Sequence, residues 1–251
     1  MDIITVTKDN LEKEHICCAI GNNNDCGVSA KKLWLSKEFD EGLVFKKGNV
    51  RGKCFIEYIP SEMAWCPIEA PSYMFINCLW VSGKFKGKGN SSILLNECIK
   101  DSKEKGKKGL VILSSKKKMP YISDGKFLRY KGFQLADKLN PYYELLYLPF
   151  SDNSNKPFFK DSVRNINIKE KGFVLFYSHQ CPFTAKYVPL IKSLAQKKNI
   201  PFKTVLFESK EEAQNAPSPF TTYSLFYNGE FVTNDILSEK KFQKLLIEKE
   251  L

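Results

Sequence analysis

Several features are absent from this sequence, and each absence excludes a class of protein. No apolar run reaches the ~20 residues that a membrane-spanning helix needs. The first residues, Met1–Thr5, carry no basic segment followed by an apolar block, so we expect no secretory signal and a cytoplasmic location. The chain has no internal repeats and no long disordered tail, so its 251 residues are enough for one large or two medium domains with real cores.

Patterns that bind metals are also scarce. The chain has two His and eight Cys, and no CxxC unit occurs, which argues against a structural zinc site. Without a secretory signal, we expect the thiols to be reduced. His15, Cys17, Cys18 and Cys26 can be drawn as a metal cluster, but a buried helix face followed by a polar loop explains them better. We therefore expect no metal.

Basic residues are in excess. Lys and Arg number 39 against 28 Asp and Glu, which gives a formal net charge of +11. A basic protein attracts anions, including nucleic acids and phosphorylated cofactors. Much of the lysine lies in short runs that are typical of solvated helix ends and loops, at 103–108 and 116–118. Charge alone therefore does not choose between these partners.

The first 150 residues alternate between strand and helix patterns. Residues 73–81 are almost continuously apolar, as a buried central strand should be. A later helix places Leu94, Leu95 and Cys98 on one face. The other expected strands are 3–6, 42–46, 53–59, 109–113, 133–136 and 143–148. The other expected helices are 11–17, 29–40 and 124–130. This order predicts an α/β (α+β) domain with a mixed sheet.

A polar segment at 151–157 separates this domain from a second pattern. We expect a domain at 1–150, a linker and lead-in at 151–170, and a smaller domain at 171–251. In the smaller domain, strand 172–177, helix 182–197 and strand 202–207 form a βαβ unit. Strands 222–227 and 230–233 flank Asn228-Gly229, a strong hairpin signal, and Ser238 caps a last helix.

A glycine-rich basic loop between residues 82 and 91 joins the apolar strand to the amphipathic helix. Glycines let backbone N–H groups converge on one point. A helix N-terminus adds free N–H donors and partial positive charge, and together they form a cradle that suits a diphosphate. Lysines beside it strengthen the attraction for an anion.

This loop resembles motif A of the GNAT superfamily, in which a strand ending in Val leads to Arg/Gln-x-x-Gly-x-Gly/Ala at a helix start. The match here is Lys86-x-x-Gly89-x-Ser91, five residues after Val81, and the alternative register Lys84-x-x-Gly87-x-Gly89 puts the helix leucines out of phase. The resemblance implies an acetyl-CoA-dependent N-acetyltransferase with the GNAT fold. The CoA-binding residues that it implies are Leu79, Trp80, Val81, Lys84, Lys86, Gly87, Lys88, Gly89, Asn90 and Ser91.

The catalytic groups are less well marked. A base must remove a proton from the attacking ammonium, and we take Glu57 as the candidate, with Glu62 and Glu69 as alternatives. In the GNAT superfamily a Tyr four residues before a Gly-Phe pair protonates the leaving thiolate. Leu128 stands at that place, so we take Tyr130, with Tyr121 and Ser123 as alternatives.

The second domain places Cys181 between a strand and a helix that begins with Pro182. A thiol there faces the helix dipole, which favours the thiolate. The segment resembles the active-site turn of the thioredoxin fold, but Thr184 replaces the resolving Cys and Thr221 stands in place of the cis-proline. The two domains together resemble GNAT proteins with a YoaP-like, thioredoxin-like C-terminal domain.

These patterns predict acyl transfer by direct attack of an amine on acetyl-CoA in a ternary complex. The acceptor is an amine on a small molecule, peptide or protein. One alternative is a monothiol redox or thiol-binding protein that acts through Cys181. A basic nucleic-acid-binding module ranks last, because charge is its only signature. The sequence leaves the acceptor and the oligomeric state open.

Overall fold

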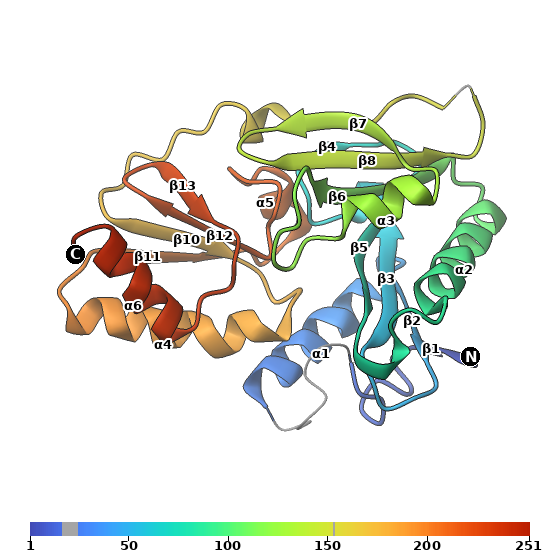
Figure 1. The fold of residues 1–251 in the computed structure, drawn as a ribbon, viewed down its shortest axis with the longest axis horizontal. Coiled ribbons are helices and arrows are strands. Elements are labelled where there is room, and N and C mark those ends of the chain that lie inside the picture. Colours follow the sequence, from blue (N-terminus) through green and yellow to red (C-terminus); the bar gives the residue numbers. More distant parts are fainter. Residues whose placement is uncertain (17–24, 153) are drawn as a thin grey trace.

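The computed structural model describes residues 1–16, 25–152 and 154–251. It contains a seven-stranded sheet and a four-stranded sheet that lie side by side, with helices around them (Figure 1). The Cys17 and Cys18 of the metal-cluster alternative lie outside the described residues.

The larger sheet has the order β1-β2-β3-β5-β6-β8-β7. Every neighbouring pair is antiparallel except β5 and β6, so the sheet is mixed, as the sequence predicted. Its strands are β1 (Ile3–Val6), β2 (Val44–Gly48), β3 (Cys54–Pro60), β5 (Tyr73–Val81), β6 (Gly109–Ser115), β7 (Gln134–Leu139) and β8 (Tyr143–Pro149).

Alternation along the strands sends side chains to two separate cores. On one face, helix α2 (Asn90–Glu104) and helix α3 (Gly125–Tyr130) cover alternate residues of β3, β5 and β6. Leu94, Leu95 and Cys98 are buried there, which confirms the face that the sequence predicted for this helix. On the other face lies helix α1 (Cys26–Glu38), with Val28, Trp34 and Leu35 in the core.

The smaller sheet has the order β11-β10-β12-β13. Strands β10 (Phe173–Tyr177) and β11 (Phe202–Leu206) are parallel and connected by α4 (Pro182–Lys197). Strands β12 (Tyr223–Tyr227) and β13 (Glu230–Thr233) form the expected hairpin, with positive φ at Asn228 and Gly229. Helix α6 (Glu239–Glu248) is capped by Ser238, as predicted, and α4 and α6 share one core with the sheet.

The second face of the smaller sheet packs against the first half of the chain. The short helix α5 (Lys210–Gln214) places Ala213 in the same hydrophobic cluster as Val28, Trp34 and Leu35 of α1. The segment between the sheets joins this cluster through Phe159 and Val163, and β9 (Phe158–Phe159) pairs with β4 (Ile68–Glu69). The segment that the sequence marked as a linker is therefore fixed along part of its length by buried apolar groups.

One expected helix is wrong over its described part. Residues 8–13 form turns, and no helix runs through Ile16. The Asn10 side chain accepts a hydrogen bond from the Thr7 N–H and donates one to the Thr5 carbonyl, which holds a tight turn. The competition between Asn side chains and the backbone is the usual reason why such residues interrupt helices.

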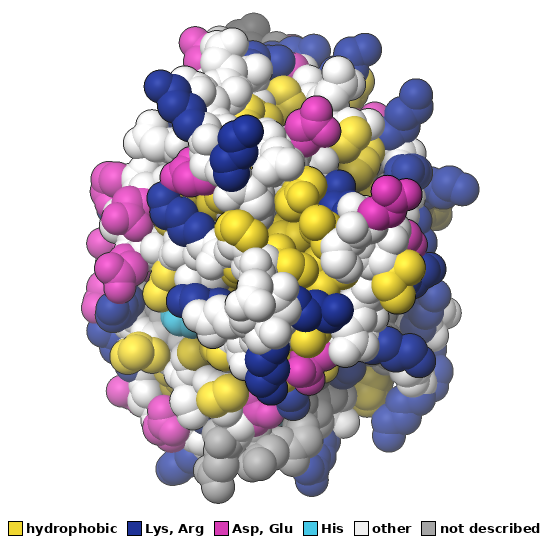
Figure 2. Space-filling view, turned by 90° about the vertical axis from the view of Figure 1, so that its left-hand side faces the viewer, with side chains coloured by type: hydrophobic (Ala, Val, Ile, Leu, Met, Phe, Trp, Pro, Cys, Tyr) yellow, Lys and Arg dark blue, Asp and Glu magenta, His cyan; other side chains and the backbone are white. Residues whose placement is uncertain are grey.

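The end of the molecule formed by the smaller sheet is viewed in Figure 2. Lys and Arg side chains are dispersed over this face among acidic and neutral ones, and an apolar area lies near its centre. The positive charge on this face is therefore not gathered into one continuous stripe.

Candidate active site

The central strand β5 opens away from its parallel neighbour part-way along its length. β5 pairs with β6 only from Tyr73 to Ile76, whereas its pairing with β3 runs from Met74 to Val81. The β3–β5 register shifts at Glu57, which faces Cys78 while the next residue, Tyr58, faces Ile76. Asn77 is thus the extra residue of a β-bulge, a feature that bends a strand and re-aims its side chains. Beyond it, residues 77–81 of β5 have no β6 neighbour in the sheet.

The loop between β5 and α2 has the backbone that the glycine pattern predicted. Gly83, Gly87 and Gly89 have φ of +61°, +75° and +76°, and a Cβ at any of them would meet nothing within 4 Å. These are left-handed conformations that favour glycine, but they face open space, so the loop is not shaped by close packing. Its glycines leave the backbone of the loop accessible from outside.

Helix α2 begins directly after this loop. Gly89 is its N-cap, and the first N–H groups bonded within the turn, those of Ser92 and Ile93, both reach the Gly89 carbonyl. The earlier N–H groups of Asn90 and Ser91 precede these bonds, as is general at a helix start. Free N–H groups at a helix start and the helix dipole are the features on which anion sites are generally built.

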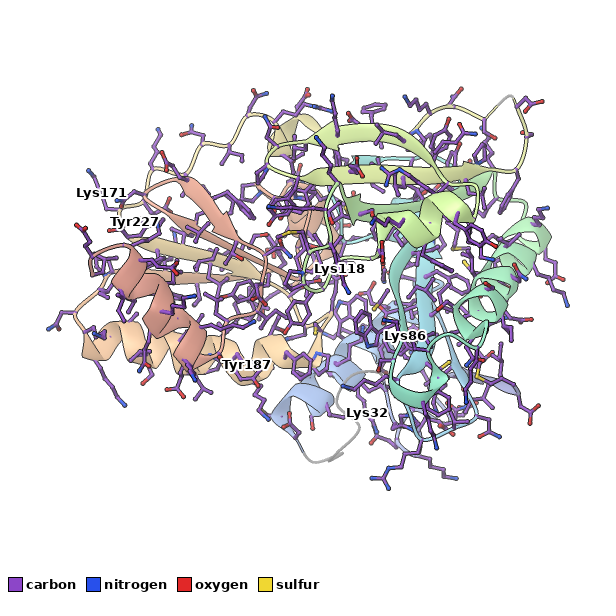
Figure 3. The ribbon with its side chains drawn as sticks, in the orientation of Figure 1. Lys32, Lys86, Lys118, Lys171, Tyr187 and Tyr227 are labelled. Carbon is purple, nitrogen blue, oxygen red and sulfur yellow. The ribbon has the colours of Figure 1, made fainter. Side chains whose placement is uncertain are left out.

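Lysines surround this helix start. Lys84, Lys86 and Lys88 are exposed, and Lys86 lies close to the beginning of α2 (Figure 3). Asn90 differs from them: its side chain is buried and donates to the Phe85 carbonyl at 2.8 Å. Of the predicted CoA-binding residues, Asn90 therefore also has a structural role, since it ties the loop to the helix.

Glu57 lies at the bulge, on the α1 face of the sheet, and is 2% exposed. Its Oε2 accepts a hydrogen bond from Lys31 Nζ at 2.6 Å, and its Oε1 accepts one from Asn77 Nδ2 at 3.0 Å. The Lys31 side chain is equally buried and its Nζ lies 4.1 Å from the centre of the Trp34 ring. A buried carboxylate needs such compensation, because an unpaired charge there is very costly.

Sequence analysis did not identify Lys31. The signal was present, because Lys31 lies three residues from both Val28 and Trp34 and therefore on the apolar face of α1. A charged lysine buried on such a face needs an anionic partner, because an unpaired buried charge is costly. Glu57 is that anion.

A second buried carboxyl group lies beside this pair. Glu38, at the end of α1, is 5% exposed and accepts a hydrogen bond from Trp65 Nε1 at 3.0 Å. Burial raises the pKa of Glu38 to about 7, against the opposing effect of the Trp65 hydrogen bond. Sequence analysis did not identify this group either.

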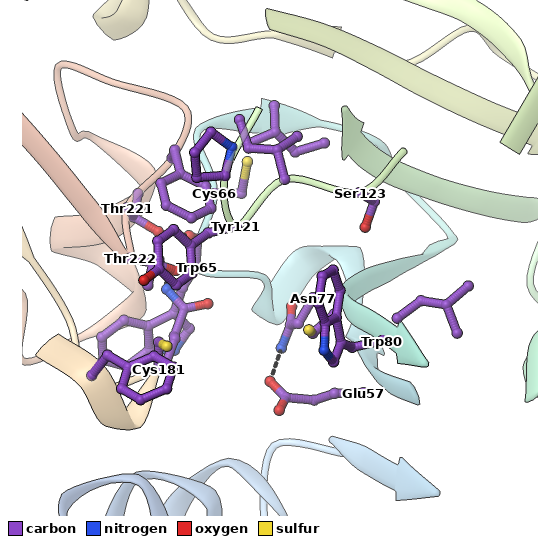
Figure 4. A pocket seen from close by; sticks show the side chains of 18 of the residues that line it. Glu57, Trp65, Cys66, Asn77, Trp80, Tyr121, Ser123, Cys181, Thr221 and Thr222 are labelled. Carbon is purple, nitrogen blue, oxygen red and sulfur yellow. Dashed lines mark hydrogen bonds between the residues drawn. The ribbon is translucent and has the colours of Figure 1, made fainter. Parts of the chain in front are cut away.

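A cavity of about 390 Å³ begins at the open end of β5. Glu57, Asn77 and Trp80 line one side, and Cys181 and Thr222 face them from the smaller sheet (Figure 4). Its walls are mainly apolar and aromatic, and they come from both halves of the chain. The aromatic residues that line it are Phe55, Trp65, Phe75, Trp80, Tyr121, Phe183 and Phe220.

The structure brings together some of the predicted catalytic residues and separates others. Glu57 and Cys181 line the same cavity. Tyr130 does not line it: this side chain is 82% exposed, at the end of α3. The alternatives Tyr121 and Ser123 do line it, whereas Glu62 and Glu69 do not.

Of the predicted CoA-binding residues, Leu79 and Trp80 line the cavity. The loop residues Lys84, Lys86, Gly87, Lys88, Gly89, Asn90 and Ser91 lie outside it, and so does Val81, which packs against the α2 core. The loop and the cavity are therefore consecutive along β5. Within the described parts of the chain, no group of three or more His, Cys, Asp or Glu side chains is arranged to hold a metal ion.

Cys181 is the N-cap of α4, and Pro182 occupies the first turn, as the sequence predicted. Thr184 is fully buried, and its Oγ1 donates to the carbonyls of Ser178 and Cys181 at 2.7 and 2.8 Å. This hydroxyl holds the turn. Burial lowers the pKa of the neighbouring His179.

Comparison with known proteins identifies the class of enzyme. The chain is 44% identical over 247 residues to the N-acetyltransferase YoaP of Bacillus subtilis strain 168, and the match spans 98% of both chains. The chain belongs to the YoaP family of N-acetyltransferases. The YoaP-like family model itself matches residues 201–244, which run from β11 into α6.

Matches among solved structures are more distant in sequence. One is a GNAT-family acetyltransferase from Desulfovibrio desulfuricans, 11% identical, with a TM-score of 0.42 over 60% of this chain and 100% of its own. Another is the PaiA N-acetyltransferase from Thermoplasma acidophilum in complex with coenzyme A, 15% identical, with a TM-score of 0.41 over the same shares. The relative from B. subtilis confirms the predicted N-acetyltransferase class.

No helix in the described residues combines the length and the apolar character required to cross a membrane.

Proposed function

We propose that this member of the YoaP family transfers the acetyl group of acetyl-CoA to an amine held in the cavity at the open end of β5. One observation carries this proposal. The glycine-rich loop and the start of α2 come immediately after Leu79 and Trp80, the strand residues that line the cavity, and this order supports an anion cradle beside the cavity. A CoA diphosphate at the cradle places the pantetheine arm along β5, so that its thioester reaches the cavity.

In this reaction the amine nitrogen attacks the thioester carbonyl, a C–N bond forms, and the C–S bond breaks to release the CoA thiolate. The amine loses one proton, and the thiolate can take one. β5 has no β6 neighbour in the sheet beyond Ile76, and we propose that a backbone N–H of this stretch donates to the oxyanion. We propose that Glu57, held by Lys31 and Asn77, attracts the acceptor ammonium and receives its proton through water.

For the proton that goes to the thiolate, we propose Tyr121 instead of Tyr130. Tyr121 lines the cavity, and its ring makes an edge contact with Phe183 at 6.3 Å between centroids. Replacement of Tyr121 by Phe should lower kcat more than it raises KM, because the hydroxyl acts at the leaving group.

We also infer that residues 171–251 form a thioredoxin-like domain. The order β11-β10-β12-β13, the parallel β10–β11 pair and the crossover helix α4 support this interpretation. Gln180 Nε2 donates to Thr221 Oγ1 at 3.0 Å, so the Cys181 turn lies against the segment where thioredoxins carry their cis-proline. Thr184 stands in place of a resolving Cys, so we assign this domain a binding role instead of dithiol exchange.

Calorimetric titration of acetyl-CoA tests the proposed donor site. Gly89→Asp places bulk and negative charge in the cradle, and should abolish micromolar binding. Gly106→Asp is a matched control, because Gly106 also has positive φ (+66°) with open space around it but lies at the far end of α2. Binding that is absent in the wild type, or equally reduced in both variants, would contradict the proposal.

A further inference from the structure

The cavity has walls from both halves of the chain, and these walls are fixed to each other. Asn234 Nδ2 donates to the Pro120 carbonyl at 3.0 Å, and Cys66 Sγ donates to the Pro219 carbonyl at 3.3 Å. Thr221 Oγ1 donates to the Trp65 carbonyl. Because Trp65, Cys66, Pro120, Pro219 and Thr221 all line the cavity, these bonds hold its opposing walls together at the cavity itself. The smaller domain therefore forms one wall of this cavity and is held in place by these hydrogen bonds.

Two side chains with acceptor oxygens line the cavity from different walls. Asn77 lies on the bulge of β5, and Asp235 lies between β13 and α6. Asp235 Oδ2 accepts a hydrogen bond from Lys241 Nζ at 2.6 Å. The Asp235 side chain is 20% exposed, so its carboxylate is an acceptor that a donor on a ligand can reach.

These two side chains mark opposite ends of the cavity lining. Asn77 lies beside Glu57, where the reacting amine must come, and Asp235 belongs to the smaller domain. Between them the lining is largely aromatic, and the volume of about 390 Å³ lies in the range of small-molecule sites, about 300–1,000 Å³. A lysine side chain on a protein surface would supply the amine but would leave the walls of the smaller domain unfilled.

We propose that this cavity binds a small acceptor that has a primary amine at one end, an aromatic or similarly flat apolar body, and a second hydrogen-bond donor that reaches Asp235. The inference rests on the proposed function and names its substrate class. It makes the smaller domain the part of the enzyme that selects the acceptor, and it assigns Asp235 as a specificity-determining residue.

The first experiment compares tyramine, phenethylamine and a lysine-containing peptide as acceptors, with the acetylated products measured by mass spectrometry. Tyramine and phenethylamine differ by the distal hydroxyl donor, so kcat/KM should favour tyramine roughly ten-fold or more. Asp235→Ala should remove this preference. Lys241→Ala breaks the same ion pair but leaves the Asp235 carboxylate in place, and should retain the preference.

A second pair of variants tests the location without depending on the acceptor chosen. Thr222→Trp fills the cavity from the smaller domain, and should reduce acetylation at least a hundred-fold while the Kd for acetyl-CoA stays within two-fold. Glu230→Trp, at an exposed position of the same domain, should change neither.

Three results would overturn the inference while leaving acetyl transfer intact. They are equal use of the two aromatic amines, preference for the peptide, and normal acetylation by Thr222→Trp. Acetyl-CoA binding without acetylation of either aromatic amine would overturn it as well. Failure of the wild type to bind acetyl-CoA would instead overturn the proposed function, so the two failures are distinguishable.

Discussion

At the scale of single residues, the Lys31–Glu57 pair is the contact on which the site depends most. Both side chains are almost fully buried and lie 2.6 Å apart. Removal of one partner leaves an uncompensated charge, so Lys31→Met should destabilise the fold by about 3–5 kcal/mol. Lys31→Met/Glu57→Leu removes both charges and should be less destabilised than Lys31→Met alone. Urea unfolding measures both, and a double variant that is less stable than the single one would contradict this account.

Glu57→Gln tests the chemistry, and its stability is measured beside its kinetics because the variant leaves the buried Lys31 charge without a carboxylate. The amide oxygen can still accept a hydrogen bond from Lys31, but the group can no longer take a proton. We expect kcat to fall roughly 100-fold or more, with acetyl-CoA affinity retained. A variant with unchanged kcat would show that Glu57 only positions Asn77 and α1.

Glu38 should make the stability of the folded protein depend on pH. Its pKa is about 7 when folded against an ordinary value of 4.5, so the folded state binds the proton more tightly. Stability from this group is fully present below about pH 4.5 and is lost as pH rises to about 7. Glu38→Gln keeps the acceptor for Trp65 and avoids ionisation.

Glu38→Gln should therefore be more stable than the wild type at pH 8, by up to about 3 kcal/mol. At pH 5 the two proteins should differ little. Thermal unfolding at the two pH values measures this, and an equal difference at both would exclude the titration of Glu38 as its cause.

At the scale of elements, the start of α1 lies against the start of α4. A Cβ at Gly27 would lie 1.9 Å from the Pro182 carbonyl oxygen, which neither backbone can accommodate without a shift. Gly27→Ala should cost about 1–3 kcal/mol despite the better helix propensity of alanine. Because Pro182 lines the cavity, acceptor kcat/KM should fall while the Kd for acetyl-CoA is kept.

Ser29→Ala is the control for this prediction, since Ser29 is an exposed residue of the same helix. Urea unfolding and acceptor kinetics are measured on both variants. If Gly27→Ala and Ser29→Ala have the same unfolding free energy and the same acceptor kcat/KM, the close approach of α1 and α4 contributes nothing to stability or activity.

Most elements were predictable because their signals are local. The apolar run at Tyr73–Val81, the proline that begins α4 and the Asn228-Gly229 turn each specify structure over a few residues. The bulge at Asn77 was not predictable, because it depends on how β3 and β5 pair. The short strands β4 and β9 were missed for the same reason, since each consists of two residues and exists only through its partner.

Of the candidate site, only the glycine-rich loop was predictable from the sequence, and the cavity was not. The loop that follows Val81 carries its own glycine signature, whereas the cavity joins residues that lie more than a hundred positions apart, such as Glu57 and Cys181. Their meeting depends on how two sheets pack, which no periodic pattern encodes. The position of Tyr130, the predicted acid, depends on packing in the same way, because α3 is oriented so that this side chain faces solvent.

At the scale of the whole molecule, the net charge of +11 should speed the capture of a polyanionic donor. Opposite charges steer association at low salt, and salt screens this over about 10 Å at 0.1 M. Between about 20 mM and about 500 mM salt, the association rate for CoA should fall roughly ten-fold, with a smaller change in dissociation. Stopped-flow fluorescence can follow this through Trp80, which is 45% exposed and adjacent to the loop.

Two triple variants distinguish steering by the whole molecule from contact at the loop. One replaces the loop lysines Lys84, Lys86 and Lys88 by Gln. The other replaces three exposed lysines of α4 and α6, Lys197, Lys240 and Lys244, and removes the same amount of charge. Both should slow association, but only the loop variant should also speed dissociation, because only it loses contacts with bound phosphates. An association rate that does not respond to salt would exclude electrostatic steering. A distal variant that binds as fast as the wild type would show that capture depends on the loop lysines alone.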